Sequence, residues 1–174
     1  GLVIIDQHAL HERMMFQLLI ERIEQSGELE SQRLLTPAVV GLTRGQMAVV
    51  EELEPLLKKI GIEAEAIGPE SVAVQAFASL LFERGVDPVD FVQELVERAE
   101  DDGFDPSTEG ALHEVLDMIS CKAAVKAGDR LAEEELAELL KRKDAVERAS
   151  NCPHGRPTTV RLTLRELEKH FGRT

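Results

Sequence analysis

"GLVIIDQHALHERMMFQLLIERIEQSG", residues 1–27, changes its hydrophobic pattern within the first few positions. The run "GLVIID" is short and apolar, which is typical of a strand, and it ends at Asp6. Helical spacing follows and stops at Gly27. One face of this predicted helix is apolar and consists of Met15, Leu18, Leu19 and Ile23. A strand that leads directly into a helix therefore opens the chain.

The other end of the chain has the same order of elements. "TVRLTL" is typical of a strand, and "RELEKHFG" after it is typical of a helix. Thr163 and Glu166 have the spacing of a capping box, in which each residue satisfies a backbone N–H of the other. The order along the chain favours one lobe built from both chain ends, with the middle segment inserted as a second lobe.

The middle segment mixes helices with a β-hairpin. Thr43 and Gln46 form another capping-box pattern and open a helix that Gly61 closes. "IEAEAIG" and "SVAVQAF" flank the turn "GPE" and predict a hairpin, while a further helix starts near Pro88. "SQRLLTPAVV" is extended and broken at Pro37. Two more helices are expected at 109–127 and 131–143.

We therefore predict an α+β fold with two lobes. Residues 1–31 and 112–174 would form one lobe, a small sheet with helices. Residues 32–111 would form the other, helices plus a β-hairpin. A chain of 174 residues that is 43% hydrophobic is long enough to bury a core in either arrangement.

Composition limits the cellular setting and the partners. No run of 18 apolar residues exists, so no membrane partner is expected, and the start lacks the basic region of a signal peptide. We interpret the chain as a fragment whose upstream part has been removed. Two cysteines favour a reducing, cytoplasmic setting. The absence of Trp and Tyr argues against a stacking platform for single-stranded nucleic acid.

The net charge of −13 is unevenly distributed. Residues 1–37 carry 3 basic and 6 acidic side chains, and residues 38–119 carry 5 and 18, a net charge of −13. Residues 120–174 carry 12 basic and 9 acidic side chains, a net charge of +3. The middle would repel a phosphate backbone and the tail would tolerate one, so we expect weak binding of duplex DNA by the chain alone.

"DQHALHE" is the first candidate site. His8 and Glu12 are four residues apart, so on a helix they share a face, and Asp6 lies at the junction before it. Two carboxylates and an imidazole suit a divalent cation. The alternative is a solvated helix face with Asp6 as its N-cap. His11 is a competing ligand that would point about 60° away from His8.

Both cysteines are also candidates. "NCPHGRPT", residues 151–158, places Cys152 two positions before His154 in a loop whose prolines exclude a helix interior. Such a loop is either half of a metal site or a coincidence. Cys121 lies within a predicted helix, where a lone cysteine is either a ligand or a small buried hydrophobe. Together these side chains form a set suited to zinc or manganese.

Three motifs carry a family resemblance. "DQHALHE", "SCKAAVKAGD" and "CPHGRPT", in this order and over this span, resemble the C-terminal domain of the mismatch-repair protein family MutL, in its DNA-nicking branch. The resemblance covers almost the whole chain. The family motif continues with a second Glu where this chain has Gln17, a position that we do not assign as a ligand. The final "FGR", Phe171 to Arg173, is similar to a short motif at the family's C-terminus.

The resemblance implies a homodimerising endonuclease lobe (1–31 and 112–174), an external regulatory lobe (32–111), and an ATP-binding domain upstream. It implies nicking of one strand of duplex DNA near a mismatch, in cooperation with the mismatch-recognition protein MutS. The cofactors would be a tightly bound Zn²⁺ and a catalytic Mn²⁺, or Mg²⁺ in its place. The catalytic residues would be Asp6, His8 and Glu12. The metal ligands would be His8, Glu12, Cys121, Cys152 and His154.

Two further assignments complete the expected site. Arg156 either contacts phosphate or braces its loop. "QRLLTP" matches the pattern by which bacterial replication proteins dock into the sliding clamp, through Gln32, Leu34, Leu35 and Pro37. The alternative is an ordinary strand leading into a proline turn. Three other functions stay open: a non-catalytic dimerisation module with a structural zinc, a zinc hydrolase of small molecules, and an adaptor that only binds the clamp.

Overall fold

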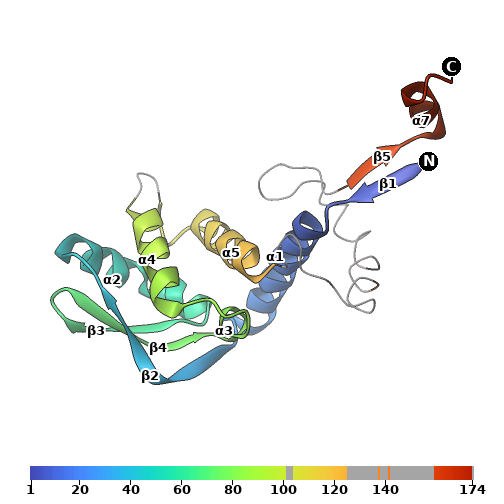
Figure 1. Cartoon of the computed structure of the whole chain (residues 1–174). Helices are drawn as coiled ribbons and strands as arrows, with labels where there is room; N and C mark the ends of the chain where they lie inside the picture. The colour runs from blue at the N-terminus through green and yellow to red at the C-terminus, as the bar shows by residue number, and fades with distance from the viewer. Residues whose placement is uncertain (101–103, 125–136, 138–140, 142–158, 174) are drawn as a thin grey trace. The chain divides into compact units, whose positions relative to one another are not determined.

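The computed structural model describes residues 1–100, 104–124, 137, 141 and 159–173, and within them it has helices and two small β-sheets (Figure 1). The α+β class predicted from the sequence is confirmed. The chain divides into two compact units. We call Gly1–Gln17 with Ala124–Thr174 the end unit, and Leu18–Ala123 the central unit. The lobe boundaries predicted from the sequence, at residues 31/32 and 111/112, stay a prediction.

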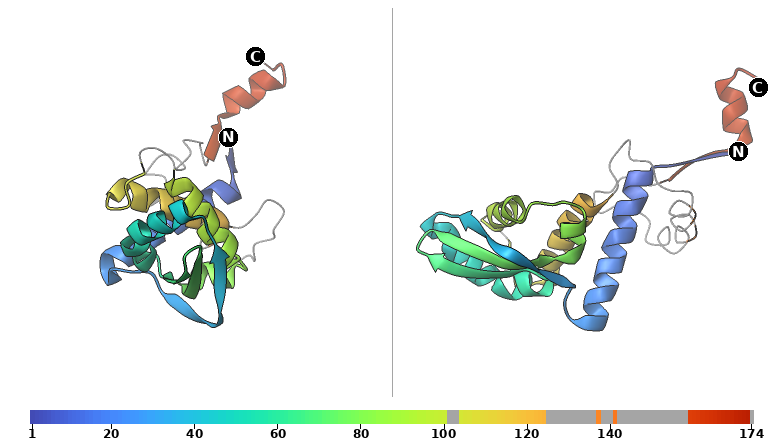
Figure 2. Two further views of the ribbon diagram at one scale, coloured as in Figure 1. Left: turned by 90° about the vertical axis from the view of Figure 1, so that its left-hand side faces the viewer. Right: turned by 60° about the horizontal axis from the view of Figure 1, so that its bottom comes forward.

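The end unit contains a two-stranded antiparallel sheet. β1 (Leu2–Ile5) pairs with β5 (Thr159–Leu162) (Figure 2). Leu2 lies opposite Leu162, and Ile4 lies opposite Val160. α1 (Gln7–Ser26) starts here and continues into the central unit. Leu10 and Met14 of α1 form a small buried cluster with Ile5 packed against it. The predicted strand-to-helix order at the start of the chain is confirmed.

α7 (Leu164–His170) follows β5 through the predicted capping box. Glu166 donates its backbone N–H to the Thr163 hydroxyl at 3.2 Å, and Thr163 donates its N–H to the Glu166 carboxylate at 2.7 Å. Hydrogen bonds from the Thr163 backbone and then from its hydroxyl hold the pKa of Glu166 below its ordinary value. The cap fixes where the last helix begins, because it satisfies N–H groups that the helix itself leaves unpaired.

The central unit is built on a three-stranded antiparallel sheet in the order β2-β4-β3. β2 spans Ser31–Gly41, and the predicted hairpin consists of β3 (Glu63–Gly68) and β4 (Ser71–Ala78). β2 continues through Pro37, but its pairing with β4 is interrupted between Arg33 and Ala38. The predicted break is therefore a break in the ladder rather than the end of a strand, as expected for a proline that lacks an N–H.

Four helices complete the described part of the central unit beyond α1. α2 (Arg44–Lys59) packs against β3, and α4 (Pro88–Ala99) packs against β2 and β4; the two helices also contact one another (Figure 1). Asp87 caps α4 by accepting from two backbone N–H groups, and Pro88 occupies its first position. α3 (Ser79–Glu83) was not predicted, and α5 (Glu109–Ala123) ends four residues earlier than predicted. The helix predicted at 131–143 lies outside the described residues, apart from 137 and 141.

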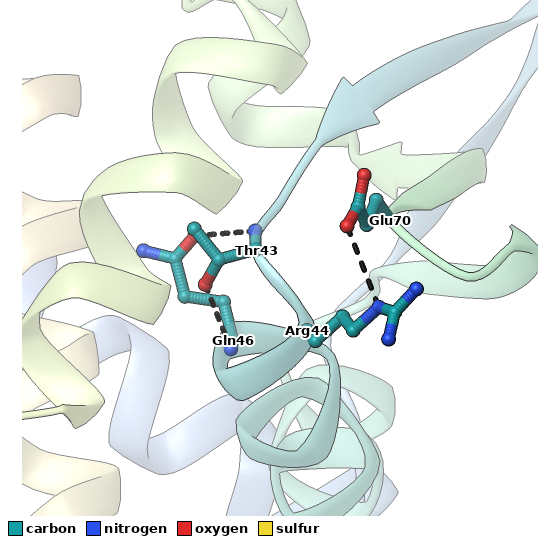
Figure 3. A network of polar contacts seen from close by, with 4 residues as sticks. All are labelled: Thr43, Arg44, Gln46 and Glu70. Atoms are coloured by element: carbon teal, nitrogen blue, oxygen red, sulfur yellow. Dashed lines mark hydrogen bonds and ion pairs between the residues drawn. The ribbon is translucent and has the colours of Figure 1, made fainter.

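Figure 3 shows the start of α2 in detail. Thr43 accepts from the Gln46 backbone N–H at 3.2 Å, and the Gln46 side chain accepts from the Thr43 N–H at 3.0 Å, which confirms the second capping box. Arg44 lies 3.5 Å from Glu70 of the hairpin turn in an exposed ion pair. Such pairs contribute roughly 0–1 kcal/mol, so the cap rather than the ion pair defines this helix start.

The core of the central unit lies between the sheet and its helices. Phe77 of β4 and Phe91 of α4 meet edge-to-face with ring centroids 5.7 Å apart, a preferred aromatic geometry. β4 is the middle strand and is buried along most of its length. The other large, fully buried side chains of this unit include Leu53, Leu56, Ile60, Ile62, Leu81, Leu95, Leu116 and Ile119.

Gly61 is a position of the central unit where both the backbone conformation and the space around it favour glycine. Its φ is +75°, and a Cβ there would lie 2.9 Å from the carbonyl oxygen of Leu29. We expect Gly61→Ala to destabilise the protein by about 2 kcal/mol or more, through the left-handed backbone and the backbone clash together. Gly85 has a φ of +69° with nothing within 4 Å, so Gly85→Ala should cost about 1 kcal/mol. Urea unfolding of both variants measures the difference, and equal costs would contradict the close approach.

Candidate metal and docking sites

Asp6 begins α1 and acts as its N-cap. Its carboxylate accepts a hydrogen bond from the backbone N–H of Ala9 at 3.1 Å, and its carbonyl oxygen accepts from Leu10 at 3.0 Å. The side chain is exposed. A carboxylate at this position also interacts favourably with the positive end of the helix dipole. The capping role that the sequence left open for Asp6 is thus present.

His8 and Glu12 lie one helical turn apart in the first half of α1. The spacing of four residues puts both side chains on one face of the helix, as predicted. His8 is half-buried, whereas Glu12 is only 4% exposed. Within the described ranges, Glu12 is the one buried residue with an ionisable acidic or basic side chain. A buried carboxyl group is paired, bound to a cation or neutralised by a proton, because desolvation of an isolated charge is costly.

Cys121 lies in α5 of the central unit, and its side chain is exposed. The interpretation of this cysteine as a small buried hydrophobe is therefore wrong: the apolar face of α5 is formed by neighbours such as Val115 and Ile119. The next residue, Lys122, forms an ion pair with Glu94 at 2.6 Å that ties α5 to α4. An exposed thiol on a fixed helix is accessible to a metal or to solvent.

The remaining predicted ligands, Cys152 and His154, lie outside the described residues, and so does Arg156. Among the residues that the structure describes, no three His, Cys, Asp or Glu side chains are grouped so that they could hold a metal ion. The metal-ligand set thus stays a prediction. Of this set, His8 and Glu12 can be described together, and they lie on one face of α1, as their spacing of four residues predicts.

The stretch "QRLLTP" lies in β2, at one edge of the three-stranded sheet. Gln32 and Pro37 are exposed, Leu34 is half-buried and Leu35 is fully exposed. The interruption of the ladder between Arg33 and Ala38 falls within this stretch. A leucine displayed from an edge strand where pairing is broken is accessible to another protein.

The β1–β5 sheet displays an apolar face that sequence reasoning had not located. Side chains alternate across a strand, so Leu2 and Ile4 share a face with their cross-strand partners Leu162 and Val160. Ile4 is 52% exposed, and Leu2 and Val160 are also exposed. The alternation of apolar residues in "TVRL" with Arg161 was the available signal. A contiguous exposed apolar face on a sheet is typical of an interaction surface.

Most of the chain matches one known protein family. The family described as "MutL C terminal dimerisation domain" matches residues 1–131. The chain belongs to the MutL C-terminal dimerisation domain family. Within the described residues, no helix is both long and apolar enough to span a membrane.

Relatives in this family cover almost the whole chain. The DNA mismatch repair protein MutL of Syntrophus aciditrophicus is 36% identical over 173 residues, which is 99% of this chain and 28% of the relative. The protein of the same name from Syntrophobacter fumaroxidans is 38% identical over 174 residues, 100% of this chain and 25% of the relative. That of Geotalea daltonii is 37% identical over 173 residues. The chain spans about a quarter of the length of these MutL relatives.

Proposed function

We propose that this chain is the endonuclease part of a MutL-type mismatch-repair protein, which nicks one strand of duplex DNA with the help of bound metal. The observation that carries this proposal is the His8–Glu12 pair at the start of α1, with a buried carboxylate, in a chain of the MutL family. Buried ionisable side chains of this kind are typical of metal and catalytic sites. Nicking of supercoiled plasmid in the presence of Mn²⁺ tests the activity directly.

The donor chemistry of the chain fits the proposed metals. Imidazole and thiolate ligands favour Zn²⁺, and carboxylates admit Mn²⁺ or Mg²⁺. The ligands would be His8, Glu12, Cys121, Cys152 and His154, as predicted from the sequence. Bound metal would supply charge neutralisation at the phosphate and a lowered pKa of the attacking water. Within the chain itself, α1 would present His8 and Glu12 on one face, and Asp6 would supply a carboxylate at the helix start where water is accessible.

Zinc content tests the ligand set independently of activity. We expect the double variant Cys152→Ser, His154→Ala to lose most of the zinc found in the purified parent protein, because removal of two of four or five ligands leaves an incomplete site. Metal analysis by mass spectrometry measures zinc per chain. His170→Ala, which changes an exposed histidine on α7 outside the proposed set, should keep full zinc. Full zinc retention by the double variant would remove the loop from the site.

We also propose that the chain forms a homodimer through the apolar face of the β1–β5 sheet. Leu2, Ile4 and Val160 on this face are exposed in the single chain, and a symmetric interface is the commonest way to cover such a face. The family description as a dimerisation domain supports the proposal.

The dimer has a matched pair of test variants. We expect the parent to sediment at about twice 19.3 kDa at low micromolar concentration. Ile4→Lys should weaken dimerisation on the order of 100-fold, because it buries an uncompensated charge in the interface. Val3→Lys places the same charge on the opposite face of β1 and should leave the dimer intact. A monomeric parent, or equal effects of the two variants, would contradict this interface.

Docking to a sliding clamp is a second proposed function of the same chain. The specific observation in its favour is Leu35, fully exposed on edge strand β2 at the interruption of its pairing. An extended peptide with a glutamine, two aliphatic residues and a proline suits an apolar groove. A non-catalytic dimerisation module with a structural zinc is the alternative to the endonuclease, and it would have no use for the Asp6 carboxylate beyond capping α1.

A further inference from the structure

A cavity in the central unit shares no residue with the proposed metal, dimer and clamp-docking sites. It has a volume of about 330 Å³, near the lower end of the roughly 300–1,000 Å³ range of ligand pockets. Three segments line it: the connection between α1 and β2 with the first residue of β2, α2 from Val50 onward, and the turn from α2 into β3 with the start of β3. All three belong to the central unit, so the cavity is a feature of one compact body.

Backbone contacts hold the walls of this cavity in place. Leu29 donates its N–H to the carbonyl oxygen of Lys59 at 2.8 Å, and Ser79 donates to Glu30 at 2.9 Å. Gly61 lets the two segments approach closely, since a side chain there would meet the backbone of Leu29. The cavity is therefore a preformed part of the fold, and a ligand would not have to order its walls on binding.

The floor of the cavity is apolar and its mouth is acidic. Four buried side chains lie among its lining residues: Leu29, Val50, Leu57 and Ile62. Charged side chains from all three segments complete the lining: Glu28, Glu54, Glu63 and Lys58. All four are exposed, and in the part of the chain that the structure describes none of them takes part in an ion pair within 4 Å. Three carboxylates against one ammonium group leave the mouth negatively charged.

An apolar cavity with an acidic mouth suits a long side chain that ends in a positive charge. Arginine and lysine have an aliphatic stem that packs on apolar surface and a cationic head that remains at the rim. The guanidinium of arginine also donates two hydrogen bonds to a carboxylate, which an ammonium cannot do in the same planar geometry. The surrounding segment 38–119, with its net charge of −13, attracts basic molecules and repels nucleic acid.

The neighbouring strand offers a second means of binding. Glu63 and Ala64 at the start of β3 line the cavity, and β3 is an edge of the described three-stranded sheet. An edge strand presents backbone N–H and C=O groups to which an extended peptide can add as a further strand. A peptide on this edge could therefore place one side chain into the cavity while its backbone pairs with β3.

We propose that this cavity is a docking site for an extended, basic segment of a partner protein, with an arginine side chain inserted between the three glutamates. The site is independent of the proposed metal chemistry and of the stretch "QRLLTP", since it shares no residue with either. Its occupant is a protein segment, because the charge of the central unit disfavours DNA.

Peptide binding to matched variants tests the proposal. The probe is a fluorescein-labelled peptide GKVRVKG, followed by fluorescence polarisation at low salt with the whole 174-residue chain. Glu28→Gln with Glu63→Gln should weaken binding about tenfold, because each lost contact is a charge-assisted one at a partly desolvated rim. Glu51→Gln with Glu52→Gln removes two exposed carboxylates of α2 that do not line the cavity, and should change binding less than about twofold. Circular dichroism checks that all variants are folded.

Three outcomes would overturn the proposal. Equal effects of the two double variants would show general charge attraction. Absence of binding by the parent below about 1 mM would leave the cavity without this ligand. A second peptide, LKRKDAV, copies residues 140–146 of the chain itself. If it binds more tightly than the probe, the occupant of the cavity is a segment of this chain rather than of a partner. Replacement of the probe's arginine by glutamine should weaken binding to the parent about as much as the Glu28, Glu63 double variant does.

Discussion

Asp6→Asn is expected to lower Mn²⁺-dependent nicking of supercoiled plasmid by about 10²–10⁴-fold, the range for loss of a positioned acid–base group. Asparagine is as good an N-cap as aspartate, so the hydrogen bond from the Ala9 N–H persists and α1 begins at the same residue. The substitution therefore removes a negative charge at nearly constant shape. Conversion of supercoiled to open-circular plasmid on a gel measures the rate.

Two controls separate catalysis from stability. Glu24→Gln removes an exposed carboxylate near the other end of α1, and it should cut DNA at the parent rate. Asp6→Ala removes both the charge and the cap, so it should lose activity and also about 1 kcal/mol of stability. If Asp6→Asn cuts as fast as the parent while Asp6→Ala is destabilised, Asp6 is a helix cap only. The module with a structural zinc would then be the better account of the chain.

Local chemistry made much of the fold predictable. The spacing of Thr43 with Gln46, and of Thr163 with Glu166, marked two helix starts, since a capping box depends only on residues within one turn. The hairpin around Pro69 followed from two short strand patterns separated by a turn. α3 was missed because five residues are too few to show a helical period, and its position depends on β4 packing beside it.

Long-range features were harder to predict. The exposure of Cys121 depends on which face of α5 the rest of the central unit covers. The spacing of apolar residues around Cys121 did not show which face is covered. The burial of Glu12 was likewise not predicted, because spacing within one helix does not show what packs against it, although its alignment with His8 followed from helical geometry. Spacing predicts which side chains share a face, whereas convergence of distant segments into one site requires the fold itself.

The charge of the chain predicts weak binding of DNA, although DNA is the proposed substrate. The segment 38–119 has a net charge of −13 and repels phosphate, and the segment 120–174, at +3, offers few contacts, so unaided binding should be weak and salt-sensitive. A sliding clamp that already encircles DNA would overcome this by tethering, because a short tether gives an effective concentration in the millimolar range. The benefit would come from proximity without any new DNA contact.

Gln32→Ala with Leu35→Ala is therefore expected to abolish stimulation by the clamp, a loss on the order of 10²-fold or more, and to leave the slow clamp-free nicking unchanged. Both side chains are exposed, so their removal should not disturb the β2–β4 ladder. Nicking rates with and without clamp measure the two activities side by side. Val39→Ala shortens another exposed side chain of β2 outside the motif, and it should keep full stimulation.

The pattern of losses distinguishes the possible roles of this stretch. If clamp-dependent and clamp-free nicking fall together in the Gln32, Leu35 variant, the stretch supports the fold of the central unit and the docking proposal is wrong. If neither falls, the clamp binds elsewhere on the chain or not at all. Loss of stimulation alone, with Val39→Ala unaffected, is the result that edge-strand docking requires, because only the exposed side chains of the motif would contact the clamp.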